Sequence, residues 1–286
     1  TKVVDYYGDG SSFGVNITYV YQGKARGLAD AVYKVKDVVS DRFLVYLGDN
    51  LVPYDLKKFA NFRGSASILL AKVENPNRFG VAVIREGKVV KLVEKPKEPI
   101  SEYALVGVYA FTREVFDVIE KLKPSWRGEL EITDAIQGLI DEGKEVSYEI
   151  VDGWWKDTGT PRDILEANAF LLDKHAERRI EGLVENSTVD GRVIVERGAV
   201  IKNSVVRGPV YIGRNTKIAN SYIGPFTSIG DSCEITDSEI EHSVILDNVK
   251  VRGVYLLDSL IGNDSTVEKG KRWYKLIIGE NSSVVL

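Results

Sequence analysis

Two acidic residues that lie far apart in the chain each follow an apolar run of strand-like composition. Asp49 comes shortly after Phe43–Leu47, and Asp157 comes shortly after Val146–Val151. Mg²⁺ typically takes one or two carboxylates and fills its remaining positions with phosphate oxygens and water. Asp49 and Asp157 therefore indicate a shared divalent ion that acts on a phosphate-bearing substrate.

Two cationic residues complete a candidate phosphate site. Lys95 follows Glu94 at the end of the apolar run Val89–Val93, and Arg127 lies in a polar segment further along the chain. A guanidinium offers a planar fork that suits phosphate, and an ammonium supplies a compact positive charge. Two carboxylates with two cations indicate phosphoryl-type transfer, in which catalysis is mostly positioning and charge neutralisation.

Each of these motifs also has a purely structural interpretation. Asp49 with Asn50 is typical of a turn, Glu94 with Lys95 of a solvated pair, and Asp157 of a strand end before a helix. The interpretation as one site depends on their coming together, and ligands collect beyond the carboxyl ends of strands in open α/β sheets.

The first part of the chain, about 170 residues, alternates strand-like and helix-like segments, which is typical of an α/β sheet. The apolar, β-rich runs are Ile17–Tyr21, Phe43–Leu47, Ser67–Val73, Val89–Val93, Ala104–Phe111 and Val146–Val151. The apolar spacing over Ile132–Ile140 predicts a one-faced helix. A further helix is expected from Thr160, as N-cap, to about His175. The polar stretch His175–Gly182 is interpreted as a linker.

From Val189 onward, aliphatic residues recur every five or six positions, which fits neither a helix nor a flat strand. Three series step by 16 or 17 residues: Val195, Ile212, Ile229, Ile245 and Ile261; Ile201, Ile218, Ile235, Val251 and Val267; Val206, Ile223, Ile240 and Leu256. A three-faced coil explains them, because each face contributes one aliphatic residue that stacks on the coil below. We expect a left-handed parallel β-helix of hexapeptide repeats with about five coils; the alternative is an irregular β-sandwich.

The order of the motifs resembles that of the sugar-nucleotide pyrophosphorylases over nearly the whole chain. The matching segments are Gln22…Gly27-Leu-Ala, Leu47-Gly-Asp-Asn50, Arg78-Phe-Gly80, Leu92-Val-Glu-Lys-Pro96, Leu105-Val-Gly107, Arg127-Gly-Glu-Leu-Glu-Ile-Thr-Asp134 and Trp155-Lys-Asp-Thr-Gly159. The last two motifs together resemble the thymidylyl-transferring members most, in their long form with a C-terminal β-helix. The resemblance implies a Rossmann-like nucleotidyltransferase domain with a mixed sheet at 1–175 and the β-helix at 183–286.

The resemblance also implies roles for individual residues. Catalysis would rest on Asp49, Asp157, Lys95 and Arg127, and Asp49 and Asp157 would hold Mg²⁺. The nucleotide would contact Gln22, Gly27, Gly48 and Asp49, and the sugar phosphate would contact Gly80, Glu94, Lys95, Gly107, Arg127 and Trp155. The residue types suit these roles, because an amide pairs with an imide edge, a carboxylate with hydroxyls and cations with phosphate.

One element of the family pattern has no counterpart in this sequence. Members carry a glycine-rich loop with a following Arg and Lys on the first strand-to-helix turn, where it cradles the triphosphate. The opening residues 1–14 resemble a segment well downstream of that loop and lead into a strand-like run. The chain begins at Thr1 and contains no methionine. We therefore expect the printed chain to lack the first βα unit of its domain.

The implied reaction makes dTDP-glucose and pyrophosphate from dTTP and glucose 1-phosphate, by in-line attack on the α-phosphorus. Three alternatives stay open: a UTP-using uridylyltransferase, a bifunctional nucleotidyltransferase and acetyltransferase, and a non-catalytic regulatory paralogue. The acetyltransferase would need a coil-corner histidine as general base, and His242 is the candidate in the repeats.

Composition narrows the setting. The 286 residues carry a net charge of −4, which argues against nucleic acid as the main partner. The single cysteine, Cys233, excludes an internal disulfide, and no apolar run approaches the ~18 residues of a membrane span. We expect a cytoplasmic enzyme with no membrane partner. Because open strand edges invite pairing, we also expect a homo-oligomer.

Overall fold

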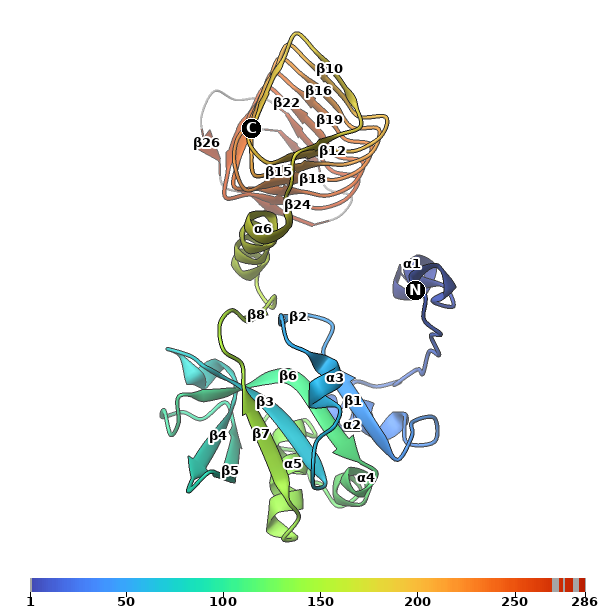
Figure 1. Ribbon diagram of the computed structural model, residues 1–286, viewed down its shortest axis with the longest axis vertical. Coiled ribbons are helices and arrows are strands. Elements are labelled where there is room, and N and C mark those ends of the chain that lie inside the picture. The colour runs from blue at the N-terminus through green and yellow to red at the C-terminus, as the bar shows by residue number, and fades with distance from the viewer. Residues whose placement is uncertain (1, 269–272, 275, 280–282, 286) are drawn as a thin grey trace. The chain divides into compact units, whose positions relative to one another are not determined.

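The computed structural model describes residues 2–268, 273–274, 276–279 and 283–285. The chain divides into two compact units, Thr1–Asp157 and Thr158–Leu286, of which the first holds a mixed sheet with helices and the second a parallel β-helix (Figure 1). The predicted fold class is confirmed. Helix α6 (Pro161–His175) falls in the second unit, and the domain boundaries proposed from the sequence remain predictions.

The sheet of the first unit has the strand order β5-β4-β6-β3-β7, with β1 also paired to β6. Its strands are β1 (Arg42–Tyr46), β3 (Ala66–Lys72), β4 (Gly80–Arg85), β5 (Lys88–Glu94), β6 (Tyr103–Thr112) and β7 (Val146–Ile150). Only the β3–β7 pair is parallel among the described pairs of this sheet. Five of the six apolar runs thus form strands, and the sheet is mixed as expected.

The long strand β6 carries two strands end to end along one side. Strand β1 pairs with the C-terminal half of β6, from Val108 to Thr112, whereas β4 pairs with β6 at Ala104. Gly107 lies between the two stretches, and its carbonyl accepts a hydrogen bond of 2.8 Å from the N–H of Leu47, just after β1. The end of β1 and the start of β4 therefore meet near the middle of β6.

Alternate side chains of β3 and β6 face two separate cores, as the two-residue period of a strand requires. One core packs Ile68, Tyr109 and Phe111 against helices α2 (Leu28–Lys34), α4 (Glu114–Ile119) and α5 (Ile132–Asp141). The other packs Leu69, Val106 and Val108 against Phe59 of α3 (Leu56–Phe59). The remaining short elements of this unit are α1 (Lys2–Tyr7), η1 (Ser11–Phe13), β2 (Asn50–Leu51), η2 (Pro76–Arg78) and β8 (Lys156–Asp157).

The predicted strand at Ile17–Tyr21 is wrong. The structure has no regular element over these residues, and Tyr21 is 91% exposed. The run has the composition of a strand, but none of the described strands pairs with it. A lone extended segment gains neither ladder hydrogen bonds nor a packed face, so composition alone does not make it a strand.

Helix α6 begins as its sequence predicts. The hydroxyl of Thr160 accepts a hydrogen bond of 3.3 Å from the N–H of Asp163, and the Asp163 carboxylate accepts one of 3.1 Å from the N–H of Thr160. This reciprocal capping box satisfies two N–H groups that lack helical partners. Further along the helix, the Asn168 amide donates to the carbonyl of Phe226 at 2.9 Å, which fastens α6 to a β-helix coil within the second unit.

Over its described residues, the β-helix has three parallel sheets of seven, six and seven strands. Its strands are β9 (Arg179–Ile180), β10 (Leu183–Glu185), β11 (Thr188–Asp190), β12 (Val193–Val195), β13 (Val200–Lys202), β14 (Val205–Arg207), β15 (Val210–Ile212), β16 (Lys217–Ala219), β17 (Tyr222–Ile223), β18 (Thr227–Ile229), β19 (Glu234–Thr236), β20 (Glu239–Glu241), β21 (Val244–Ile245), β22 (Lys250–Arg252), β23 (Tyr255–Leu257), β24 (Leu260–Ile261), β25 (Thr266–Glu268), β26 (Trp273–Tyr274), β27 (Ile277–Ile278) and β28 (Ser283–Val285). Strand β9 pairs with β12 and therefore belongs to the β-helix, although it lies inside the stretch His175–Gly182 interpreted as a linker.

All three predicted aliphatic series are ladders of direct register partners. Val195 opposes Ile212, which opposes Ile229, and the other two series continue in the same way from coil to coil. Every member of the series is at most 1% exposed. The period in the sequence therefore reflects a stack of aliphatic side chains along the interior of the coil.

The corners of the coil hold polar ladders that the aliphatic period does not reveal. Asn203, Asn220 and Asp237 occupy successive corners with φ near +50°. Asn and Asp tolerate this left-handed conformation because their short side chains bond locally. The Asn220 amide donates to Asp237 at 3.2 Å, and the Ser221 N–H donates to the hydroxyl of Ser204 at 3.1 Å. These contacts satisfy backbone and side-chain groups where the ladders turn.

The repeated Ile-Gly pairs have a steric cause. The Asp231 carboxylate accepts a hydrogen bond of 2.6 Å from the N–H of Arg214, and a Cβ atom at Gly213 would lie 2.5 Å from the same oxygen. Gly230 stands in the same relation to Asp247. Glycine is needed at these corners because a side chain would displace the carboxylate that caps the neighbouring coil.

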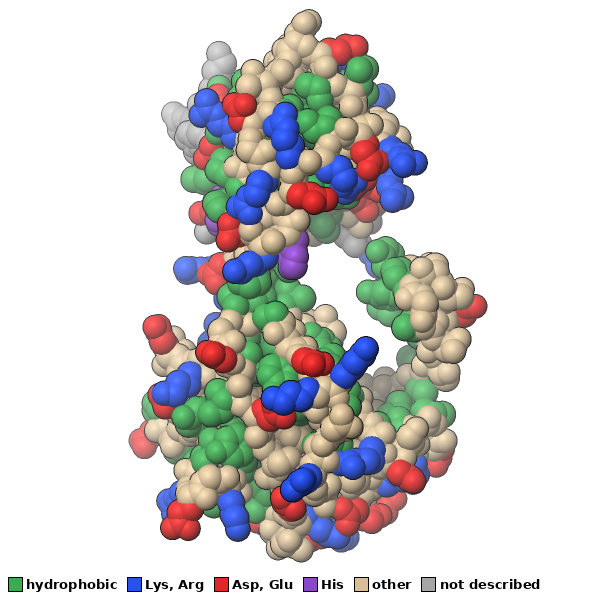
Figure 2. Space-filling model, in the orientation of Figure 1, with side chains coloured by type: hydrophobic (Ala, Val, Ile, Leu, Met, Phe, Trp, Pro, Cys, Tyr) green, Lys and Arg blue, Asp and Glu red, His purple; other side chains and the backbone are tan. Residues whose placement is uncertain are grey.

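The surface carries charges of both signs. On the face drawn in Figure 2, Lys and Arg side chains are intermixed with Asp and Glu over both units. Within the part of the chain that the structure describes, no helix has the length and apolarity that crossing a membrane would require.

Removing one aliphatic side chain from the interior stack should destabilise the β-helix. Ile229 is 0% exposed, so Ile229→Ala leaves a cavity, and we expect a loss of about 2–5 kcal/mol in the unfolding free energy of this unit. Chemical denaturation followed by far-ultraviolet circular dichroism measures the loss. Leu257→Ala is the control, because Leu257 lies on the outside and is 39% exposed. Equal losses in the two variants would contradict the interior stack.

Candidate active site

One cavity of the first unit brings together most of the residues singled out in the sequence. Of the predicted site residues, Asp49, Gly80, Glu94, Lys95, Gly107, Arg127, Trp155 and Asp157 line it. Leu105, Gly107 and Tyr109 are alternate residues of β6 and share one face of that strand. Leu28 and Ile132, the first residues of α2 and α5, also line the cavity.

The cavity forms where β1, β4 and β5 meet on β6, and this differs from the sequence-based expectation. Strand β5 runs antiparallel to β4, which runs antiparallel to β6, so β5 points the opposite way from β1 and β7, although its last residue, Glu94, lies in the same row of the sheet as Ile150 at the end of β7. Glu94 pairs with Gly80 at the start of β4. The motifs come together because the end of β1 meets the start of β4 along β6.

A tight turn and a short strand pair position Asp49 and Asp157. The N–H of Asn50 donates to the carbonyl of Leu47 at 3.0 Å, which closes a turn over Gly48 and Asp49. Strand β2 then pairs antiparallel with β8, with Asn50 opposite Asp157. Asp49 is therefore the chain neighbour of the residue that opposes Asp157, and both carboxylates belong to the wall of the same cavity.

The donor chemistry of this wall fits a divalent cation. The lining includes five carboxylate residues, Asp49, Glu94, Glu129, Glu131 and Asp157, against three cationic ones, Arg78, Lys95 and Arg127. Among the residues that the structure describes, no group of three or more His, Cys, Asp or Glu side chains is arranged to hold a metal. Two carboxylates suit Mg²⁺ nevertheless, because substrate phosphates and waters commonly complete its coordination.

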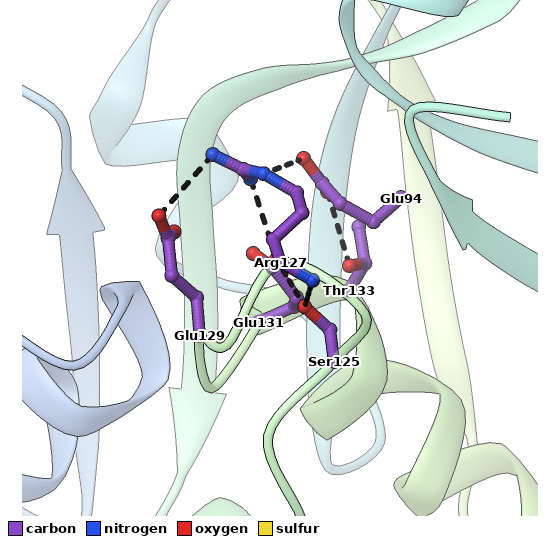
Figure 3. A network of polar contacts seen from close by, with 6 residues as sticks. All are labelled: Glu94, Ser125, Arg127, Glu129, Glu131 and Thr133. Atoms are coloured by element: carbon purple, nitrogen blue, oxygen red, sulfur yellow. Dashed lines mark hydrogen bonds and ion pairs between the residues drawn. The ribbon is translucent and has the colours of Figure 1, made fainter.

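Arg127 lies among three carboxylates (Figure 3). Its guanidinium nitrogens are 3.3 Å from Glu129, 3.3 Å from Glu131 and 3.6 Å from Glu94. The hydroxyl of Ser125 donates to the same Glu131 oxygen at 2.9 Å and accepts from the Arg127 N–H at 3.1 Å. The Arg127 side chain, 26% exposed, is thus held beside the cavity by long ion pairs that a phosphate can replace.

Glu94 is a carboxylate in an unfavourable setting. Burial and the neighbouring charge of Glu131 raise the pKa of Glu94, although a hydrogen bond of 3.1 Å from Thr133 and the charges of Lys95 and Arg127 oppose the rise. A Cβ atom at Gly80 would lie 3.0 Å from a Glu94 oxygen, so glycine leaves that oxygen its space. A partly desolvated acceptor of this kind binds hydroxyl groups well.

Tyr109 connects the two acidic parts of the wall. Burial and the charges of Glu94 and Asp49 raise the pKa of Tyr109, so its phenol stays protonated at neutral pH. Lys95, another lining residue, adopts a left-handed backbone conformation with φ of +42°, which is rare for a residue with a side chain and clusters at functional sites. Its N–H donates to the carbonyl of Phe79 at 3.0 Å.

An aromatic pair forms another part of the wall. The rings of Phe79 and Trp155 lie 5.2 Å apart between centroids, and both residues line the cavity. The indole N–H of Trp155 donates to the side-chain oxygen of Asn50 at 2.8 Å. The apolar faces of the two rings therefore lie beside the polar groups of β2 and β8.

Three predicted nucleotide contacts, Gln22, Gly27 and Gly48, are not lining residues of this cavity. The Gln22 amide donates to the carbonyl of Gly27 at 3.2 Å and to the Asp30 carboxylate at 3.1 Å. Burial opposes the ionised form of Asp30, but bonds from Gln22 and Arg26 hold its pKa below the usual range. Gly27 has φ of +111° and lies against the backbone of Leu130, so it fixes the start of α2 beside the cavity.

Sequence reasoning missed the part that Glu131, Thr133 and Asn50 play. Glu131 is 5% exposed and pairs with Arg127 four residues earlier, and Thr133 bonds to Glu94 across the cavity. In the sequence, carboxylates stand two and four residues after Arg127. This spacing indicates that Glu129 and Glu131 pair with its guanidinium. Asn50 has no comparable signal, because two of its side-chain partners, Gly107 and Trp155, lie more than fifty residues away.

The residues considered for other chemistry lie in the β-helix. His242 occupies a corner with φ of +48°, and its Nδ1 lies 2.9 Å from an oxygen of Asp258. Cys233 is buried in the coil, and burial raises the pKa of its thiol to about 11. A thiol that stays protonated at neutral pH is a poor nucleophile, so Cys233 is a packing residue.

The chain thus combines an α/β domain built on a mixed sheet with a parallel β-helix. Residues 1–174 match the family described as Nucleotidyl transferase, and residues 206–285 match the family described as GMPPB C-terminal domain. The chain belongs to the nucleotidyl transferase family, and it is a nucleotidyltransferase.

Several relatives match over almost the entire chain. The low-salt glycan biosynthesis nucleotidyltransferase Agl11 of Haloferax volcanii is 45% identical over 100% of this chain and 84% of its own length. A glucose-1-phosphate thymidylyltransferase of Streptomyces griseus is 42% identical over 98% of this chain and 82% of its own. A crystal structure of a putative glucose-1-phosphate thymidylyltransferase from Bacillus anthracis, in complex with a sucrose, matches with a TM-score of 0.54 and 44% identity, covering 59% of this chain and 70% of that one.

The raised pKa of Glu94 predicts a pH-dependent stability difference. The folded protein keeps a proton on Glu94 at pH values where the unfolded chain has released it, so the contribution of Glu94 to stability falls as pH rises through its folded pKa. Glu94→Gln carries no charge at any pH. We therefore expect its melting temperature to rise relative to the parent as pH increases from acid to neutral.

Thermal unfolding across that pH range measures the difference. The control is Glu102→Gln, which removes an exposed carboxylate paired with Lys72. This control should follow the parent closely, because exposed pairs contribute little. A melting temperature of Glu94→Gln that falls or stays constant relative to the parent toward neutral pH would contradict the raised pKa of Glu94.

Proposed function

We propose that the protein transfers a thymidylyl group from dTTP to glucose 1-phosphate and releases pyrophosphate. A phosphate oxygen of the sugar phosphate forms a bond to the α-phosphorus, and the bond from that phosphorus to the bridging oxygen of pyrophosphate breaks. The observation that carries this proposal is the shared wall of Asp49, Asp157, Lys95 and Arg127 in one cavity. The names of the Streptomyces relatives support the choice of nucleotide and sugar.

The cationic residues would bind and orient the sugar phosphate. Lys95 and Arg127 line the cavity from different elements, so they can grip two sides of one phosphate group. Arg127 would exchange its long ion pairs with Glu129 and Glu131 for shorter, charge-assisted bonds to phosphate oxygens. No protein nucleophile is required, because the sugar phosphate is already ionised at neutral pH.

The acidic residues Asp49 and Asp157 would hold Mg²⁺. The metal supplies neutralisation of the charge that develops on the transferring phosphate. In the protein, the turn at Asp49 and the pairing of β2 with β8 fix the backbone positions of the two residues before substrate arrives. Such preorganisation lowers the cost of assembling the site during the reaction.

The remaining wall suits a hexose. The Glu94 carboxylate would accept hydrogen bonds from sugar hydroxyls, with backbone groups of Gly80 and Gly107 beside it. Trp155 would cover an apolar face of the sugar ring. Gln22 and Gly27, beside the start of α2, would contact the thymine edge together with the turn at Gly48.

The role of Asp157 is tested by Asp157→Asn in the full-length protein. Loss of the metal ligand should lower turnover at least roughly 100-fold at saturating Mg²⁺, as removal of metal-site groups typically does. Asp152→Asn changes an exposed carboxylate in the same loop and should retain parental turnover. Equal pyrophosphate release by Asp157→Asn and the parent would refute the proposed metal role.

Nucleotide choice is tested by crossing four nucleoside triphosphates with several sugar 1-phosphates in a pyrophosphate-release assay. Thymine differs from uracil by one methyl group, which is worth about 1 kcal/mol when buried. We expect kcat/KM for dTTP with glucose 1-phosphate to be the highest, with UTP roughly fivefold to tenfold lower. A preference for UTP would replace the proposal by its runner-up, a uridylyltransferase.

A further inference from the structure

We propose that Asn50 is a positioning residue whose single amide holds both the Asp49 carboxylate and the Trp155 indole in place. The inference rests on the proposed function, in which Asp49 holds the metal and Trp155 covers the sugar. It adds a residue to which the motif analysis assigns no role. Asn50 would act through its two neighbours and would touch no reacting atom.

The amide of Asn50 bonds at both ends. Its oxygen accepts hydrogen bonds from the N–H of Gly107 at 3.1 Å and from the indole N–H of Trp155 at 2.8 Å. Its nitrogen donates to a carboxylate oxygen of Asp49 at 2.9 Å. Asn50 is 5% exposed, so these bonds form largely away from water, where each is stronger and its loss more costly.

The orientation of this amide follows from its partners. The backbone N–H of Gly107 and the indole N–H of Trp155 can only donate, so both require the side-chain oxygen of Asn50. The amide nitrogen must then point the other way, toward the carboxylate of Asp49, which can only accept when ionised. The environment thus selects asparagine, because aspartate lacks the donor and leucine lacks both functions.

The backbone of Asn50 is fixed independently of its amide. Its N–H closes the turn over Asp49, and its carbonyl accepts a hydrogen bond of 2.9 Å from the hydroxyl of Tyr46. The residue also begins β2 opposite Asp157. Because these contacts hold the backbone of Asn50, its side chain has little freedom to move. A residue that positions a metal ligand requires this rigidity.

Gly107 leaves the space that this amide fills. A Cβ atom at Gly107 would lie 2.6 Å from the Asn50 nitrogen and 2.7 Å from its amide carbon. Any side chain at Gly107 would push the amide away from both Asp49 and Trp155. Strand β6 therefore contributes to the site by having glycine at position 107, because the Asn50 amide occupies the space that a side chain there would need.

The first test measures Mn²⁺ binding alone, by titration of the full-length protein without nucleotide. Asn50→Ala should weaken Mn²⁺ binding about 10- to 100-fold, because groups that orient a metal ligand typically contribute this much. Asn61→Ala is the matched control, since Asn61 donates to the carbonyl of Lys57 on α3 and lies outside the cavity lining. Parental Mn²⁺ affinity in Asn50→Ala would overturn the proposal.

The second test follows the indole N–H of Trp155 by nuclear magnetic resonance with labelled tryptophan, using Trp155→Phe to identify its signal. Hydrogen exchange at this group should become at least tenfold faster in Asn50→Ala, where the acceptor is lost. In Asn50→Asp a carboxylate oxygen replaces the acceptor, so exchange should return to the parental rate. Unchanged exchange in Asn50→Ala would overturn the contact between Asn50 and Trp155.

Turnover in Asn50→Asp separates positioning from folding. This variant keeps the shape and the acceptor but cannot donate to Asp49, so kcat/KM should stay about 10- to 100-fold below the parent while Trp155 exchange is normal. Parental turnover in Asn50→Asp would overturn the role toward Asp49. Mn²⁺ binding by Asp49→Asn distinguishes the two levels: if it too binds Mn²⁺ normally, the proposed metal site itself fails, whatever Asn50 does.

Discussion

The contact between the Asn50 amide and Gly107, a strand residue without a side chain, governs the arrangement of this site. Gly107 lies where β1 ends and β4 begins along β6, and the Asn50 amide fills the space that its missing side chain leaves. Through that contact, the turn over Asp49, the Trp155 indole and the β2–β8 strand pair are fixed relative to the sheet. The cavity wall is therefore assembled by the backbone of β6 rather than by the residues that would perform chemistry.

Three carboxylates in the cavity compete for one guanidinium, that of Arg127. Arg127 has three carboxylates within 3.6 Å, and none of the three contacts is as short as a strong charge-assisted bond. Glu131 is buried, and burial together with the charge of Glu131 raises the pKa of Glu94. The protein therefore tolerates excess negative charge in this cavity. An arriving phosphate would compete with these carboxylates for the guanidinium and would bring further negative charge, so substrate binding would raise the pKa of Glu94 further.

How far the sequence predicts the structure depends on whether the information is local. The interior stack of the β-helix is predictable from the sequence, because each coil repeats the same interior residues and the register partners Ile212, Ile229 and Ile245 are the predicted ones. Strands such as β3 and β6 were visible as long apolar runs. Ile17–Tyr21 failed because its composition says nothing about a missing partner strand. Asn50 was missed as a positioning group because its contacts with Gly107 and Trp155 join segments far apart in the chain, whereas Glu131 carries a local signal in its spacing from Arg127.

The β-helix offers a way for such a protein to change size without changing its site. Each coil pairs only with the coils above and below, and its corner bonds link residues 16 or 17 positions apart. Duplication of one 17-residue segment would add a complete layer and leave every other ladder in register. Genes of this architecture can therefore lengthen or shorten the β-helix by whole coils during evolution.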